Sequence, residues 1–160
     1  MPREKRVLVE NGCYHVVNRG NQKQTIFYEE ADYENYLKIL KHYKIKYGFK
    51  VLGYCLMPNH IHLFMQPNEQ EKLPLIMQGV TQTYTIWFNK KYNKVGRLWL
   101  GRFKNMVINR DEYFVKCISY IEENPVRAGI ATHPGDYRWS SYRARVFGSK
   151  DMVLNITYST

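Results

Sequence analysis

Residues 49–66, FKVLGYCLMPNHIHLFMQ, constrain the fold of this chain more than any other segment. Two apolar runs, rich in residues typical of strands, flank the turn-forming pair Pro58-Asn59. Strands joined by so short a connection pair antiparallel, because parallel strands need a long crossover. The segment therefore predicts a β-hairpin, with strands over residues 49–57 and 61–66.

The rest of the chain alternates between strand-like and helix-like patterns. Apolar residues at helical spacing, with Gly48 as a C-terminal cap, predict a helix over Glu30–Tyr47. A helix over Asp111–Asn124 should stop before Pro125, which disfavours helical backbone in the preceding residue. The other predicted elements are strands over 12–20 and 98–108, a helix over 73–92, and a turn and helix within 136–148.

This order, β-α-β-β-α-β-α, predicts an α+β fold in which helices cover an antiparallel sheet. The 160 residues contain no repeat, low-complexity stretch or flexible linker. We therefore expect a single domain over residues 1–160, with a core over about 12–125 and a C-terminal appendix over about 126–160.

Composition narrows the class of protein. No apolar run is long enough to span a membrane, and the charged N-terminal segment lacks the apolar core of a signal peptide. Three isolated cysteines suit neither a disulfide framework nor a cysteine-based zinc site, so we expect a cytoplasmic protein without a membrane association.

The net charge of +10 is the first functional indication. Aromatic residues alternate with lysines and arginines in KKYNKVGRLWLGRFK, residues 90–104. Cations that contact phosphates and rings that stack on bases suit single-stranded nucleic acid. A basic surface with its aromatic rings in the core remains the alternative.

The sequence MPNHIHLF places two histidines on one face of a predicted strand, because alternate side chains project to the same side. His60 and His62 could hold a divalent cation together, or be half-buried and hydrogen bonded. On the helix over 111–124, Tyr120 and Asn124 lie one turn apart beside the apolar stripe of Phe114, Ile118 and Ile121. Asn124 could be a ligand or a helix cap, and spacing alone does not separate Tyr120 from Tyr113 or Tyr137.

Five segments together resemble the REP-associated tyrosine transposases, a branch of the single-tyrosine HUH transposases. They are MPNHIHLF, YIEENPVRAGI, DYRWSSY, YHVVNRGNQKQTIFYEEADYENYL and GRLWLGRFK. The resemblance extends over nearly all of residues 12–143. The resemblance implies a ferredoxin-like HUH fold and cleavage of single-stranded DNA that depends on Mg²⁺ or Mn²⁺. It implies that His60, His62 and Asn124 are metal ligands and that Tyr120 is the nucleophile, which forms a 5′-phosphotyrosine intermediate.

The implied substrate is a DNA hairpin formed by a palindromic repeat, beside a short single-stranded segment. We expect Arg19, Arg102 and Lys104 to contact phosphates and Trp99 to stack on a base, although solvated cations and a core ring are the alternatives. A non-catalytic hairpin-binding protein on the same fold is the main rival function. The sequence leaves open whether the protein is a monomer or a homodimer, and whether the C-terminal appendix extends the DNA surface or covers the site.

Overall fold

The computed structural model describes residues 8–108 and 111–155. Four strands within these ranges form one antiparallel sheet in the order β2-β3-β1-β4. The strands are β1 (Cys13–Arg19), β2 (Phe49–Met57), β3 (His60–Pro67) and β4 (Lys104–Ile108). The helices are α1 (Glu30–Tyr47), α2 (Leu73–Tyr92), α3 (Asp111–Glu122), α4 (Asn124–Arg127) and α5 (Tyr142–Phe147), with short 3-10 turns η1 (Asn21–Lys23), η2 (Gln70–Lys72) and η3 (Pro134–Asp136).

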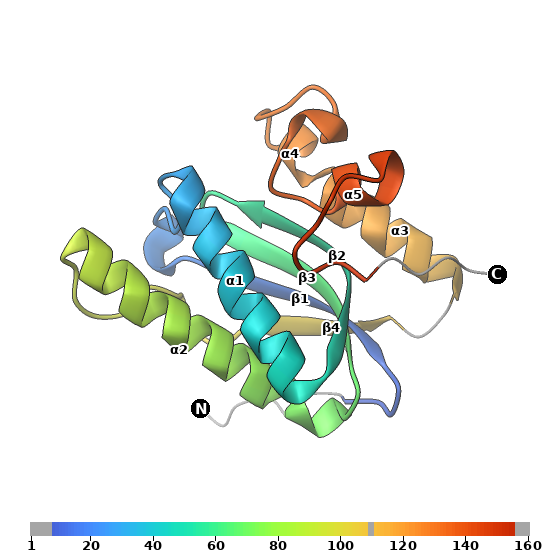
Figure 1. The fold of residues 1–160 in the computed structure, drawn as a ribbon, viewed down its shortest axis with the longest axis horizontal. Coiled ribbons are helices and arrows are strands. Elements are labelled where there is room, and N and C mark those ends of the chain that lie inside the picture. Colours follow the sequence, from blue (N-terminus) through green and yellow to red (C-terminus); the bar gives the residue numbers. More distant parts are fainter. Residues whose placement is uncertain (1–7, 109–110, 156–160) are drawn as a thin grey trace.

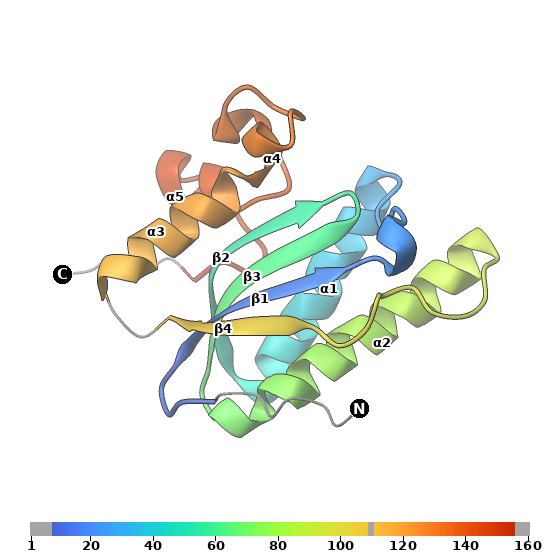
Figure 2. The same cartoon turned by 180° about the vertical axis from the view of Figure 1, so that it is seen from behind.

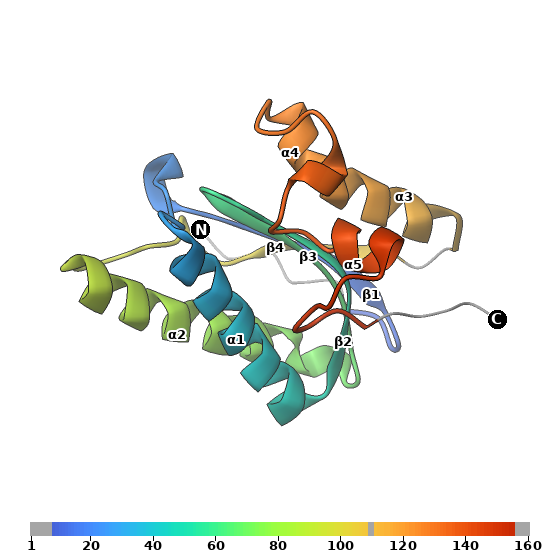
Figure 3. The same ribbon diagram turned by 45° about the horizontal axis from the view of Figure 1, so that its top comes forward.

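Helices cover both faces of the sheet. Helices α1 and α2 lie on one face, and α3, α4 and α5 lie on the other (Figures 1 and 2). Figure 3 shows the sheet between these two helical layers. The predicted α+β class is confirmed, and the βαββαβ order with this strand arrangement is ferredoxin-like.

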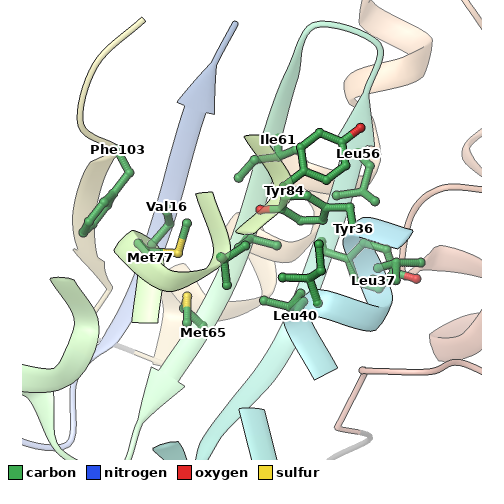
Figure 4. Close-up of a cluster of buried hydrophobic side chains, with 14 of the residues drawn as sticks. Val16, Tyr36, Leu37, Leu40, Leu56, Ile61, Met65, Met77, Tyr84 and Phe103 are labelled. Carbon is green, nitrogen blue, oxygen red and sulfur yellow. The ribbon is translucent and has the colours of Figure 1, made fainter. Parts of the chain in front are cut away.

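Alternation along the strands explains why the sheet has two apolar faces. On β3, Leu63 and Met65 are buried among residues of α1 and α2. Figure 4 shows Met65 in this cluster. Their neighbour Phe64 projects to the opposite side, where it packs with Ile118 and Ile121 of α3. Because this face also carries the even-numbered residues of β3, it receives both histidines of the predicted site.

The β2–β3 hairpin is held in place by the segment after β1. The carbonyl oxygen of Pro58 accepts a hydrogen bond from the amide of Ile26 at 2.8 Å, and that of Asn59 accepts one from Gly20 at 2.9 Å. The turn that precedes His60 is therefore fixed by backbone contacts from a distant part of the sequence. Within the described ranges, no helix is both long and apolar enough to cross a membrane.

Two predicted boundaries were wrong. The strand expected over 98–108 begins only at Lys104; Trp99 forms an isolated bridge with Gly20, and the chain leaves the ladder at Gly101. The helix expected to reach Asn124 ends at Glu122, and Asn124 instead begins the short α4. Pro125 is tolerated there because the first turn of a helix does not use its amide hydrogens.

The C-terminal appendix packs along the outer edge of β2. Backbone hydrogen bonds join Leu56 to Trp139 at 2.8 Å, Ser141 to Tyr54 at 3.0 Å, and Asn155 to Val51 at 2.8 Å. Strand edges expose unpaired backbone groups, and this segment satisfies several of them.

Candidate functional site

His60 and His62 project from β3 towards the α3 side of the sheet. Their ring centroids are 5.0 Å apart, and the side chain of His62 is only 4% exposed. The alternation predicted from the sequence thus brings the two imidazoles side by side. One cation could contact both rings at this separation.

Burial keeps both imidazoles neutral. It lowers the pKa of His60 to about 4, with a smaller contribution from the nearby charge of Arg19. It lowers the pKa of His62 to about 3, with further contributions from His15, His60 and the guanidinium groups of Arg19 and Arg127. A neutral imidazole retains a nitrogen lone pair, as a metal ligand must.

A hydrogen bond fixes which nitrogen of His60 is available. Nδ1 lies 2.7 Å from Oδ1 of Asn59, an acceptor, so Nδ1 carries the proton and donates. The lone pair therefore resides on Nε2. The turn residue Asn59 thereby selects the tautomer of the neighbouring histidine.

His15 on β1 is a third imidazole that the sequence reasoning missed. Its Nε2 lies 2.8 Å from Nδ1 of His62, and burial lowers the pKa of His15. If Nε2 of His62 binds a cation, its Nδ1 carries the proton and donates to His15. The alternation of side chains along β1 could have indicated this position. His15 and Arg19 project from the same face of β1, and the strand register places that face beside His62 and His60.

Tyr120 of α3 lies next to these imidazoles. Its ring centroid is 6.3 Å from that of His62 and 6.0 Å from that of His15, and its side chain is 52% exposed. Tyr113 is also exposed but lies two turns earlier on α3. Tyr137 is buried and its hydroxyl donates to the carbonyl oxygen of Leu56 at 2.5 Å. Of these three tyrosines, Tyr120 has its ring against the histidines and its side chain open to solvent.

Arg127 of α4 contacts both the ring and the backbone of Tyr120. Its guanidinium carbon lies 4.0 Å from the centre of the Tyr120 ring, and its Nη2 donates to the backbone oxygen of Tyr120 at 2.6 Å. Arg127 was not among the predicted site residues, although it stands in the NPVRAG segment. The break between α3 and α4 brings Arg127 back onto the ring of Tyr120. A continuous helix over these residues, as the sequence predicted, would not have made this contact.

Asn124 lies at the start of α4, four residues after Tyr120. Its Nδ2 donates to the carbonyl oxygen of Ile121 at 3.2 Å, which leaves the amide oxygen for another interaction. Among the described residues, no group of three or more His, Cys, Asp or Glu side chains could hold a metal ion. Two neutral imidazoles and one amide oxygen nevertheless suit a divalent ion whose other positions are filled by water or phosphate oxygens.

Two of the predicted phosphate contacts share the face of the histidines. Arg19 lies opposite His60 in the β1–β3 ladder, and Lys104 lies opposite Val17, which itself pairs with His62. Residues paired across strands project to the same side, so both cations flank the site. Arg102 instead lines a cavity beside α2.

Trp99 does not present a ring for stacking. It is 6% exposed and packs in the core near Tyr36 and Tyr84, with ring centroids 6.4 and 6.2 Å away. The chain buries this ring because residues 98–100 run beside the end of β1. Trp99 is therefore a core ring, which was the alternative to base stacking. We do not propose Trp99 as a residue that stacks on DNA.

Comparisons with known proteins match this arrangement. A family model described as "Transposase IS200 like" matches residues 8–124. A proposed REP-associated tyrosine transposase of Haemophilus influenzae is 30% identical over 111 residues, which are 62% of this chain and 62% of that protein. The chain thus aligns with somewhat under two thirds of this relative's length.

Solved structures share the fold. A REP-associated tyrosine transposase bound to a REP hairpin superimposes with a TM-score of 0.79 and 16% identity, covering 100% of this chain and 94% of the other. A proposed transposase from Deinococcus radiodurans R1 gives a TM-score of 0.52 with 16% identity, covering 76% and 96%. The family match spans most of the chain and includes both histidines and Tyr120, so the chain belongs to the IS200-like transposase family.

Proposed function

We propose that this protein cleaves and rejoins single-stranded DNA beside a hairpin, with Tyr120 as the nucleophile. The observation that carries the proposal is the position of the exposed Tyr120, whose ring lies beside the imidazoles of His62 and His15, both kept neutral by burial. The cations Arg19 and Lys104 on the same face supply contacts for the DNA backbone. The basic net charge of +10 agrees with a nucleic-acid substrate.

In the proposed reaction, the phenolic oxygen of Tyr120 attacks a backbone phosphorus. The bond from phosphorus to the 3′ oxygen breaks. The phenol loses its proton in this step, and the departing 3′ oxygen gains one. The product is a 5′-phosphotyrosine and a free 3′-hydroxyl, and attack by a 3′-hydroxyl reverses the step without a nucleotide cofactor.

His60, His62 and Asn124 are the proposed ligands of a Mg²⁺ or Mn²⁺ ion. Such an ion, when bound, neutralises charge that develops on a phosphate oxygen. His15 and Asn59 would hold the two ligating rings in their orientations through the hydrogen bonds at 2.8 and 2.7 Å. Arg127, stacked on the Tyr120 ring, would hold the nucleophile and add positive charge near the phosphate.

A hairpin as substrate is supported by the solved relative that is bound to a REP hairpin, although identity to it is low. The chain's own contribution is that Arg19 and Lys104 lie on the face of the sheet that carries the histidines, while Arg127 stacks on the ring of Tyr120. We therefore propose a palindromic hairpin with a single-stranded flank as the DNA that this protein binds.

The test is adduct formation with a hairpin oligonucleotide in the presence of Mn²⁺ or Mg²⁺. We expect the wild-type protein to form a covalent adduct whose modified peptide, mapped by mass spectrometry, contains Tyr120. Tyr120→Phe should bind the hairpin and form no adduct, because only the hydroxyl is removed. Tyr113→Phe is the matched control, since Tyr113 is a similarly exposed tyrosine of the same helix.

Adduct formation by Tyr120→Phe, or a modified peptide that contains Tyr113 alone, would show that another residue is the nucleophile. Tight hairpin binding by the wild type without any adduct would instead favour the non-catalytic hairpin-binding protein.

A further inference from the structure

A cavity of about 340 Å³ lies between α1 and the C-terminal appendix. The chain after α5 returns between that helix and α1, where it forms one wall of the cavity (Figures 1 and 3). Tyr54 of β2, which lines the cavity, pairs with Leu63 and shares the face of the sheet that α1 covers. The histidines project from the opposite face, so the cavity is separate from the proposed cleavage site.

Four cationic side chains line this cavity. Lys38 comes from α1, Arg138 precedes α5, Arg143 lies on α5, and Lys150 follows that helix. Arg138 is already paired with two glutamates of α1, at 3.1 and 3.2 Å. The other three cations have no carboxylate partner within the part of the chain that the structure describes.

Both carboxylates that line the cavity have partners of their own. Glu34 is one of the glutamates that pair with Arg138. Oδ2 of Asp151 accepts a hydrogen bond from the hydroxyl of Tyr54 at 2.6 Å, and its Oδ1 accepts from the amides two and three residues later, at 2.9 and 2.8 Å. Asp151 thus fixes the turn after Lys150 to β2. Four cations against two carboxylates leave an excess of two positive charges around the cavity.

A buried hydroxyl adds a hydrogen-bond donor to the lining. Ser140 is 3% exposed, and its Oγ accepts a hydrogen bond from the amide of Tyr142 at 3.3 Å. Among the described residues, no acceptor receives the hydroxyl hydrogen of Ser140. A buried donor without an acceptor costs stability, and a phosphate oxygen in the cavity would accept this hydrogen bond. Cations together with a hydroxyl donor suit the oxygens of a phosphate group.

The rest of the lining limits the size and kind of ligand. Leu37, Ala144 and Met152 contribute an apolar surface. The ring of Trp139 is already engaged, because Tyr33 stacks on it and the guanidinium of Arg138 lies over it, with centroid distances of 4.7 and 4.4 Å. It therefore offers no free face for a nucleic-acid base. The volume is at the small end of the range for ligand sites, which favours one compact molecule over a DNA strand.

We propose that this cavity binds a small phosphorylated molecule, whose phosphate lies between Lys38, Arg143 and Lys150 and accepts a hydrogen bond from Ser140. The bound phosphate joins α1 to α5 and to the segment after α5, whose positive charges repel one another when the cavity is empty. Binding therefore stabilises the contact between the C-terminal appendix and the rest of the molecule. The inference goes beyond the proposed cleavage of DNA and does not depend on it.

The test is titration of the full-length, DNA-free protein with inorganic phosphate at constant ionic strength. Amide chemical shifts locate the bound phosphate, and isothermal titration measures its affinity. We expect shifts around Lys38 and over residues 140–152, and a melting temperature that rises with phosphate concentration. Lys38→Ala and Lys150→Ala should each weaken phosphate binding by about tenfold, the effect of a lost hydrogen bond to a charged group. Both lysines are exposed, so the variants should fold.

Lys41→Ala is the matched control, because Lys41 is an exposed lysine of α1 that does not line the cavity, and it should bind phosphate as the wild type does. Lys104→Ala controls for phosphate bound near the histidines and should leave the shifts around the cavity unchanged. Shifts confined to the histidine face, or wild-type phosphate affinity in both cavity variants, would overturn the proposal. A loss of hairpin affinity in Lys38→Ala and Lys150→Ala as large as their loss of phosphate affinity would also overturn it, because these lysines would then contact DNA.

The two proposals fail separately in these experiments. Adduct formation at Tyr120 without phosphate-induced shifts around the cavity would remove the phosphate site and leave the cleavage function. Shifts around the cavity that Lys38→Ala and Lys150→Ala weaken, in a protein that forms no adduct, would remove cleavage and leave the phosphate site.

Discussion

His62 is the residue on which the proposed site depends most, because it touches both other imidazoles. It contacts His15 through a 2.8 Å hydrogen bond and His60 through their adjacent rings, and it lies beside the ring of Tyr120. Burial holds its pKa at about 3, so a proton does not compete with a cation near neutral pH.

We predict that His60→Ala or His62→Ala abolishes Mg²⁺- or Mn²⁺-dependent cleavage and changes hairpin affinity by no more than about threefold, because phosphate contacts supply most of the binding free energy. Cleavage on denaturing gels and anisotropy on the same oligonucleotide measure the two properties. Full cleavage by the double alanine variant would exclude the metal role of the histidines.

His15 supports the proposed ligand without being one. We predict that His15→Ala weakens Mn²⁺ binding by roughly 10- to 100-fold, because His62 loses the partner that fixes its tautomer and ring orientation. Isothermal titration with Mn²⁺ measures the affinity, and His42→Ala, at an exposed position of α1, is the control. An unchanged Mn²⁺ affinity in His15→Ala would remove this role.

At the scale of the helices, α3 is fixed to the C-terminal appendix through one buried carboxylate. Glu122 is 1% exposed; it pairs with Arg145 of α5 and accepts a hydrogen bond from the hydroxyl of Ser141 at 2.6 Å. Glu122 lies two residues after Tyr120, so this contact also sets the position of the nucleophile's helix on the sheet.

We predict that Arg145→Ala lowers the free energy of unfolding by about 2 kcal/mol, because it leaves the buried Glu122 carboxylate without its counter-ion. This figure is below that of a fully buried pair because Arg145 is partly exposed. Urea unfolding measures the change, and adding Glu122→Gln should restore part of the loss. Equal stability of Arg145→Ala and wild type would show that water solvates the Glu122 carboxylate well enough to replace its ion pair with Arg145.

The hairpin and the three long helices were predictable because each rests on local pattern: two apolar runs around Pro58-Asn59, and apolar spacing ended by Gly48. The apolar stripe of α3 was predicted correctly for Ile118 and Ile121, which are buried. By contrast, the fate of residues 98–103 was not predictable, because backbone bonds to Arg19 and Asn21, distant in sequence, hold them outside β4. The Arg127 contact was missed for a similar reason, since it depends on the break between α3 and α4.

At the scale of the whole molecule, the three site histidines link stability to pH. Burial lowers the pKa of all three imidazoles: the pKa of His60 falls to about 4 and that of His62 to about 3, and the pKa of His15 also lies below its ordinary value. A histidine in the unfolded chain titrates near 6.5. Below that value the unfolded chain binds protons that the folded protein excludes, so these groups contribute stability above about pH 6.5 that is lost as the pH falls.

We therefore predict that the free energy of unfolding of metal-free protein decreases from pH 7 to pH 5, a range in which carboxylates contribute little. Urea unfolding in the presence of a chelator measures it. His62→Gln should reduce the slope, since it removes one of the groups that titrate only on unfolding. An identical slope in that variant would assign the pH dependence to other residues.

The net charge of +10 predicts how binding responds to salt. Cations that contact DNA phosphates release counter-ions, so the logarithm of affinity for single-stranded DNA falls with the logarithm of salt concentration by about 0.7 for each phosphate contacted.

If Arg19 and Lys104 both contact phosphates, Arg19→Ala and Lys104→Ala should each reduce the magnitude of this slope by about 0.7. Lys38→Ala, at an exposed position of α1, should leave the slope unchanged. Anisotropy titrations of the hairpin oligonucleotide over a range of NaCl concentrations give the slopes, and equal slopes for all three variants and wild type would place the DNA on a different face of the molecule.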